Sequence, residues 1–217
     1  MSLLVKICGL STPETMDAAL EAGADMVGFV FFPPSPRAVS LDVAGPLAER
    51  ARGRAAVTVL TVDMGADGLA AIVAAVRPDW LQLHGHEPPE QVAALKRRFR
   101  LPAMKAIGVR APADLAAIAA YRGVADRILL DAKPPKGATR PGGNALAFDW
   151  AILDGFAPGM PWMLSGGLDP ANVATAIART RAPGVDVSSG VETAPGRKDA
   201  GLIAAFVAAA RGADRGT

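Results

Sequence analysis

The feature that most constrains this chain is a regular alternation of short, β-rich apolar runs with longer, alanine-rich stretches. Short apolar runs bounded by turn residues are typical of buried strands, whereas the alanine-rich stretches have the length and spacing of helices. The candidate strands are Leu3–Ile7, Met26–Phe31, Ala56–Val62, Trp80–Leu83, Ala103–Ile107, Arg127–Leu130, Trp162–Leu164 and Val185–Val187.

A candidate helix follows each candidate strand. Two helix starts, Thr12-Pro13 and Asp169-Pro170, look like a capping residue followed by proline at the first helical position. The candidate helices are Pro13–Ala22, Leu41–Ala51, Leu69–Val76, Glu90–Phe99, Ala113–Ala120, a short piece at Phe148–Leu153, Ala171–Thr180 and Arg197–Ala210.

Strands that alternate with helices through short links predict a parallel sheet with right-handed crossovers. Eight such units favour closure, so residues 1–217 are expected to form a single α/β domain, a (βα)8 TIM barrel near the lower size limit of that fold. A doubly wound open sheet is the alternative, but the Gly-x-Gly-x-x-Gly turn after the first strand is absent. The proline- and glycine-rich stretch 132–146 predicts a loop that is either functional or disordered.

Charge and hydropathy exclude several classes of partner. The net charge is only +2, and Lys96-Arg97-Arg98 is the densest basic cluster, so we expect no nucleic-acid binding. No apolar run approaches the roughly 20 residues of a membrane span, and no signal peptide is evident. The single cysteine excludes an internal disulfide framework and fits a reducing compartment, so we expect a cytoplasmic protein.

In a barrel, residues at the carboxyl ends of the strands line the active-site face. Two turns at these ends combine glycine with serine, Ser165-Gly166-Gly167 and Ser188-Ser189-Gly190. Glycine lets backbone N–H groups approach an anion, and the turns after the seventh and eighth strands are the usual phosphate site of this fold. The alternative is that each is only a tight turn.

Cys8 and Asp131 stand at the ends of the first and sixth candidate strands. A lone cysteine is often a small buried hydrophobe, and an aspartate here could cap a helix or pair with Lys133 or Lys136. The functional interpretation is a proton acceptor and a proton donor facing each other across the barrel mouth, which suits an isomerisation.

Three further side chains lie at the same face. Arg37, in the proline-rich loop after the second strand, is either a solvated loop residue or a clamp for a planar carboxylate. His84 either lines the pocket or makes a structural hydrogen bond, and His84 and His86 lack further ligands at metal spacing, so we expect no metal. Lys105 could point into the pocket, where a Schiff-base lysine would be the main rival chemistry.

Taken together, these residues resemble the phosphoribosylanthranilate isomerase family, small (βα)8 enzymes of tryptophan biosynthesis. The resemblance covers essentially the whole chain in order, and its most specific part is the pairing of Cys8 with Asp131. The matching stretches are Lys6–Gly9, Gly28–Phe31, Ser35–Arg37, Gln82–Gly85, Leu129–Asp131, Gly142-Gly143, Phe148–Trp150, Leu164–Leu168, Asp186–Glu192 and Lys198-Asp199.

The resemblance implies an Amadori rearrangement of N-(5-phosphoribosyl)anthranilate to 1-(2-carboxyphenylamino)-1-deoxyribulose 5-phosphate, with no metal or organic cofactor. It implies that Asp131 is the general acid that opens the ring and that Cys8, as thiolate, removes the C2′ proton. It further implies that Arg37 binds the anthranilate carboxylate and that Asp186 meets a ribose hydroxyl. The phosphate cradle would be Gly166, Gly167, Ser188, Ser189 and Gly190.

A thiol is only a few per cent ionised at neutral pH, so this base needs help, and Lys6 on the same strand face could supply positive charge. Two departures from the family's pattern stand out. Gly142–Leu146 lacks the family's second glycine and lysine, and Asp63 replaces a frequent asparagine. We expect both to affect affinity or product release rather than to abolish the chemistry.

Rival functions remain at this stage. An indole-glycerol-phosphate synthase would need more lysine and glutamate at the strand ends. An aminoaldose isomerase of the histidine pathway would carry aspartate where this chain has Cys8. A non-catalytic phosphate-binding barrel would need neither Cys8 nor Asp131. The partner expected is a small phosphosugar-anthranilate substrate, and the chain is expected to be a monomer or a homodimer.

Overall fold

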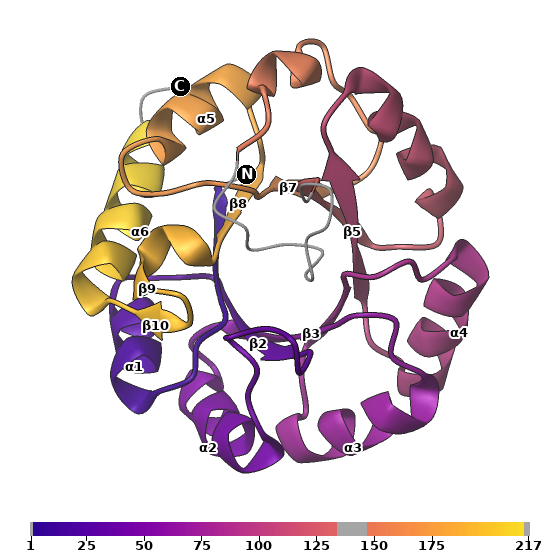
Figure 1. The fold of residues 1–217 in the computed structure, drawn as a ribbon, viewed down its shortest axis with the longest axis vertical. Helices are drawn as coiled ribbons and strands as arrows, with labels where there is room; N and C mark the ends of the chain where they lie inside the picture. Colours follow the sequence, from indigo (N-terminus) through magenta and orange to yellow (C-terminus); the bar gives the residue numbers. More distant parts are fainter. Residues whose placement is uncertain (1, 134–146, 215–217) are drawn as a thin grey trace.

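The computed structural model, which describes residues 2–133 and 147–214, has eight parallel strands that close into a barrel (Figure 1). Each strand pairs with the next along the chain, and β8 returns to pair with β1. The predicted (βα)8 barrel is therefore confirmed. Its strands are β1 (Leu4–Cys8), β2 (Met26–Phe31), β3 (Ala56–Thr61), β4 (Trp80–Leu83), β5 (Ala103–Val109), β6 (Arg127–Ala132), β7 (Trp162–Leu164) and β8 (Gly184–Val187).

Helices form an outer ring around these strands, as Figure 1 shows. The predicted cap at Thr12 is confirmed, because its side chain accepts from Thr15 N at 3.3 Å. The α-helices are α1 (Pro13–Glu21), α2 (Leu41–Ala51), α3 (Ala66–Val76), α4 (Pro89–Phe99), α5 (Val173–Thr180) and α6 (Ala200–Asp214). The described residues also form three 3₁₀ segments, η1 (Pro112–Tyr121), η2 (Trp150–Leu153) and η3 (Ser189–Val191).

The structure corrects three local predictions. Residues 113–120 lie in the 3₁₀ segment η1 rather than an α-helix, and only Ile118 of that segment is buried, so packing gives an α-helix little support. Asp169 does not cap α5, which begins at Val173. Its carboxylate instead accepts from the backbone N of Ala171 and Asn172 at 2.8 and 2.9 Å and so closes a turn.

The predicted last helix begins too early. Arg197 and Lys198 form strand β10 (Arg197–Lys198), which pairs antiparallel with β9 (Glu192–Ala194) in a hairpin beside α6 (Figure 1). Gly196 makes the turn with φ +82°, a conformation that glycine adopts without strain. Strands of only two or three residues have no recognisable alternation, so local sequence patterns do not predict this hairpin.

The barrel interior changes character along its axis. Met26, Met104 and Met163 pack together near the amino ends of their strands. Toward the carboxyl ends the buried strand residues become polar, and Lys6, Gln82, Lys105, Asp131 and Asp186 are all less than one-tenth exposed. Because buried polar groups need partners, this end of the barrel is where side-chain hydrogen bonds concentrate.

Candidate active site

A pocket opens at the carboxyl ends of the strands, and all the predicted site residues except Gly190 line it. Its remaining wall is partly apolar, with Val30, Phe32, Leu60, Val62 and Leu168. The lining also includes Cys8, Arg37, Gln82, His84, Asp131, Lys133, Ser165, Gly166, Gly167, Asp186, Ser188 and Ser189.

Cys8 ends β1 and is 3% exposed, with Lys6 beside it. Gly28 on the neighbouring strand makes this approach possible: a Cβ there would lie 3.0 Å from Cys8 Sγ and 3.3 Å from Lys6 Nζ. The Lys6 ammonium and the Cys8 thiol therefore both lie against Gly28, which has no side chain to separate them.

Lys6 does not act on Cys8 as an isolated cation, because its Nζ lies 2.7 Å from Asp186 Oδ1 and both side chains are buried. Burial alone would lower the pKa of Lys6, but Asp186 and Cys8 raise it, and the net direction is upward. Burial raises the pKa of the Cys8 thiol, and Asp186 adds to this, whereas Lys6 and Lys198 oppose it. The positive charge predicted beside Cys8 is present, but burial outweighs it.

Asp131, in β6, is held by two hydrogen bonds, one within its own strand and one from the residue after β4. Its Oδ1 accepts from Ala132 N at 2.8 Å, and its Oδ2 lies 3.1 Å from His84 Nε2. His84 Nδ1 in turn lies 3.0 Å from Gln82 Nε2, so an amide donor there would leave Nε2–H to donate to Asp131. His84 thus both lines the pocket and makes a structural hydrogen bond.

Of the two lysines that could pair with Asp131, the structure describes Lys133, and its ammonium pairs elsewhere. Lys133 Nζ lies 2.8 Å from Asp114 Oδ1 instead. Lys136 and the departure at Gly142–Leu146 both lie outside the residues that the structure describes.

The turns after β7 and β8 pack against each other and against β6. Gly166 and Gly167 have φ +86° and +64°, and a Cβ on Gly166 would overlap Ala132 N. Gly190 does not line the pocket; a Cβ there would overlap Leu168 O, so this glycine lets the two turns approach. Ser188 Oγ donates to Cys8 O at 3.1 Å and ties the β8 turn to β1.

Asp186 was expected to meet a ribose hydroxyl. It lines the pocket, but its Oδ1 accepts from Lys6 and its Oδ2 accepts from Ser165 Oγ at 3.2 Å. Asp186 therefore also holds the side chains of Lys6 and Ser165 in place.

Arg37 is 5% exposed, so its interpretation as a solvated loop residue is wrong. Its Nε and Nη2 donate to Glu192 Oε1 and Oε2 at 2.7 and 2.8 Å, a bidentate pair that the sequence analysis did not predict. Glu192 was inside a recognised motif, but nothing in the sequence showed that β9 would bring it to the loop after β2.

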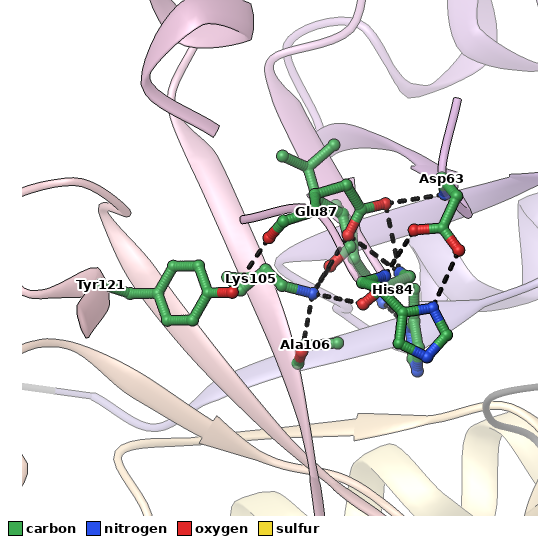
Figure 2. A network of polar contacts seen from close by, with 10 residues as sticks. Asp63, His84, Glu87, Lys105, Ala106 and Tyr121 are labelled. Atoms are coloured by element: carbon green, nitrogen blue, oxygen red, sulfur yellow. Dashed lines mark hydrogen bonds and ion pairs between the residues drawn. The ribbon is translucent and has the colours of Figure 1, made fainter. Parts of the chain in front are cut away.

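Lys105 does not line this pocket, contrary to one reading of its position. Its Nζ donates to Gly85 O at 2.7 Å, to Leu83 O and Ala106 O, and to Glu87 Oε2 at 3.1 Å (Figure 2). An ammonium with these four acceptors is a structural group, and the Schiff-base alternative has no support. Asp63 likewise lies outside the pocket lining; it accepts from the backbone N and Nδ1 of exposed His86.

Over residues 2–133 and 147–214, no group of three or more His, Cys, Asp or Glu side chains is placed to hold a metal ion. In the same part of the chain, no helix is both long enough and apolar enough to cross a membrane.

The sequence pattern of the family described as "N-(5'phosphoribosyl)anthranilate (PRA) isomerase" matches residues 5–209. The chain belongs to this family. An N-(5'-phosphoribosyl)anthranilate isomerase from Afipia carboxidovorans is 62% identical over 98% of this chain and 91% of its own length. One from Rhodopseudomonas palustris is 58% identical over 98% of this chain and 100% of its own.

Solved structures of phosphoribosylanthranilate isomerases have the same fold. The enzyme from Thermotoga maritima is 35% identical and aligns with a TM-score of 0.87, covering 97% of this chain and 99% of that one. A second isomerase structure, 34% identical with a TM-score of 0.84 and the same coverage, is a complex with reduced 1-(o-carboxyphenylamino)-1-deoxyribulose 5-phosphate.

Proposed function

We propose that this chain isomerises N-(5'-phosphoribosyl)anthranilate to 1-(2-carboxyphenylamino)-1-deoxyribulose 5-phosphate in tryptophan biosynthesis, in the cytoplasm and without a cofactor. The observation that carries the proposal is the placement of Cys8 and Asp131 in one pocket, on strands β1 and β6, in a chain of the isomerase family. A thiol and a carboxyl group on separate strands can serve the two proton transfers that this isomerisation requires.

The first transfer opens the sugar ring. Asp131 protonates the ring oxygen as the C1′–O bond breaks, and the anilino nitrogen lone pair forms the iminium. His84 holds one carboxyl oxygen and Ala132 N the other, so the acid keeps one orientation. Positioning of this kind reduces the cost of reaching the reactive geometry.

The second transfer removes the C2′ proton. The Cys8 thiolate takes it, and the C2′–H electron pair moves toward the iminium to give an enolamine. The enolamine then tautomerises to the ketone product. Lys6 and Lys198 are the two cations that favour the thiolate against the opposing effect of burial.

The remaining lining matches the two ends of the substrate. The turns Ser165-Gly166-Gly167 and Ser188-Ser189-Gly190 would hold the phosphate with backbone N–H groups. The apolar lining residues Val30, Phe32 and Leu60 suit the aromatic ring, and Arg37, which also lines the pocket, suits its carboxylate.

The rival functions fit the pocket less well. Chemistry of the indole-glycerol-phosphate synthase type needs lysine and glutamate in the site. Among the described lining residues Lys133 is the sole lysine and there is no glutamate. A non-catalytic phosphate-binding barrel would leave the ordered Cys8, Lys6 and Asp131 arrangement without a use.

The decisive experiment supplies the gene to a tryptophan auxotroph that lacks this isomerase. We expect growth without tryptophan, and no growth with the Cys8→Ala variant at equal soluble expression. Failure of the wild-type gene despite soluble protein would contradict the proposal. One structural neighbour consists of generated monomers of the dimeric isomerase from Thermotoga maritima. We propose that this chain is a monomer or a homodimer, which sedimentation velocity measures directly.

A further inference from the structure

The Arg37 side chain is fixed along its whole length. Its guanidinium makes two parallel hydrogen bonds to Glu192, at 2.7 and 2.8 Å, and the two side chains are 5% and 4% exposed. Its aliphatic stem packs on Gly9, where a Cβ would lie 2.8 Å from Arg37 Cδ. The guanidinium therefore stands in the pocket wall in one plane and at one depth.

Glu192 is itself fixed by the β9–β10 hairpin. Its Oε1 accepts from Lys198 Nζ at 2.5 Å, and its Oε2 accepts from Gly196 N at 3.1 Å. A Cβ on Gly196 would overlap Pro36 O, so the hairpin lies directly against the loop that carries Arg37. The short hairpin thus has a definite function in the fold, which is to bring one carboxylate to Arg37.

Lys198 links this pair to the rest of the site. Its Nζ also donates to Ser188 O at 2.9 Å and Ser188 Oγ at 3.3 Å, and Ser188 Oγ reaches Cys8 O at 3.1 Å. A continuous set of hydrogen bonds therefore runs from Arg37 through Glu192 and Lys198 to the turn after β8. From Ser188 in that turn it continues to Cys8 O in β1.

The charges in this cluster favour an incoming anion. Burial alone would raise the pKa of Glu192, but Arg37 and Lys198 lower it, so the carboxyl is ionised. Two cations then share one carboxylate. Burial lowers the pKa of Lys198, whereas Glu192 opposes this and favours the protonated form. In that form Arg37, Lys198 and Glu192 together have a net positive charge, which a substrate carboxylate would neutralise.

We propose that Glu192 is a positioning residue that orients the Arg37 guanidinium for a substrate carboxylate, and that it thereby sets the selection for a carboxylated aromatic amine. This inference rests on the proposed function, in which Arg37 binds anthranilate. Glu192 does not touch the reacting atoms, so its loss affects binding of the carboxylate end more than the proton transfers.

The test compares two substrates in the wild type and in Glu192→Gln: N-(5-phosphoribosyl)anthranilate and N-(5-phosphoribosyl)aniline, which lacks the carboxylate. For the anthranilate substrate we expect kcat/KM to fall roughly 10–100-fold, mainly through KM, because one charged bidentate partner is lost. For the aniline substrate we expect less than about a threefold change. Equal losses on both substrates would overturn the inference.

Asp154→Asn is the matched control. Asp154 forms a bidentate pair with Arg179 at 3.1 and 2.7 Å, but both side chains are at least half exposed and neither lines the pocket. This variant removes the same kind of ion pair and should leave both substrates unaffected. An equal selectivity loss in Asp154→Asn would show that the effect in Glu192→Gln is not specific.

A double-mutant cycle keeps the inference testable if Glu192→Gln is poorly stable. In an Arg37→Gln background, Glu192→Gln should cost no further selectivity between the two substrates, because its effect acts through Arg37. Additive losses would contradict the inference. A wild type that isomerises neither substrate would instead contradict the proposed function, so the two failures are distinct.

Discussion

Lys6 Nζ and Asp186 Oδ1 form a buried ion pair of 2.7 Å across strands β1 and β8, whose register places the two residues directly opposite each other. Both members of this pair act on the Cys8 thiol: Lys6 lowers its pKa and Asp186 raises it. The strength of the base therefore depends on the balance within this pair. The two partners act on the thiol in opposite directions, which makes their roles separable by substitution.

Removing each partner of that pair should move the Cys8 pKa in opposite directions. Lys6→Met removes a favourable charge and should raise the thiol pKa, whereas Asp186→Asn removes an unfavourable one and should lower it. The measurement is the rate of Cys8 alkylation by iodoacetamide against pH. An unchanged thiol pKa in Lys6→Met would end the case for Lys6 as the stabiliser of the thiolate.

The pH dependence of activity should show the cost of burying Cys8. The base must be the thiolate, and burial raises the pKa of Cys8 above its ordinary value. The value of kcat/KM should therefore rise with pH through neutrality, by about tenfold per unit where the thiol is mostly protonated. This limb should be absent from the residual activity of Cys8→Ala. A plateau already reached at about pH 6 would contradict the assignment.

The two proposed catalytic groups should each be needed for chemistry and not for folding. Cys8→Ala and Asp131→Asn should each lower kcat by roughly 10²–10⁴-fold, the usual scale for one general acid or base. Circular dichroism should remain that of the wild type. If either variant retained more than about a tenth of wild-type kcat, that residue would not have the proposed role.

His84 should act through Asp131. Its Nε2 lies 3.1 Å from the Asp131 carboxyl, so His84→Ala should lower kcat by roughly tenfold, the scale of one hydrogen bond. His86→Ala is the control, because that side chain is 95% exposed and pairs with Asp63 outside the pocket. Equal effects of the two substitutions would argue against a specific contribution from His84.

Lys105 should matter for stability and not for covalent chemistry. Its pair with Glu87 is almost fully buried. Lys105→Met leaves the Glu87 carboxylate with its backbone N–H partners but without a counter-charge, and should cost about 3–5 kcal/mol of unfolding free energy. Arg98→Met breaks an exposed pair with Asp67 and should cost no more than about 1 kcal/mol. Urea denaturation measures both. Borohydride trapping of a substrate adduct on the wild type would revive the Schiff-base alternative.

Local sequence signals located most of the secondary structure. The bounds of β2, β4, β7 and α2 agree with those predicted, because apolar runs and turn residues mark them unambiguously. The errors lie where local signals are weak or shared. Asp169-Pro170 resembles a helix start but closes a turn, and two-residue β10 is too short to have a pattern.

The sequence by itself determined the alternation of strands and helices and the set of side chains at the strand ends, because periodicity is a local property of the chain. Closure into a barrel rests on the pairing of β8 with β1 in the structure. The tertiary structure alone decided which of these side chains meet. Glu192 reaches Arg37 from 155 positions away, and Asp186 reaches Lys6 from 180. Lys105 turns away from the pocket because Glu87 and three carbonyl oxygens bind its ammonium. Such pairings depend on strand register and burial, which local sequence signals do not encode.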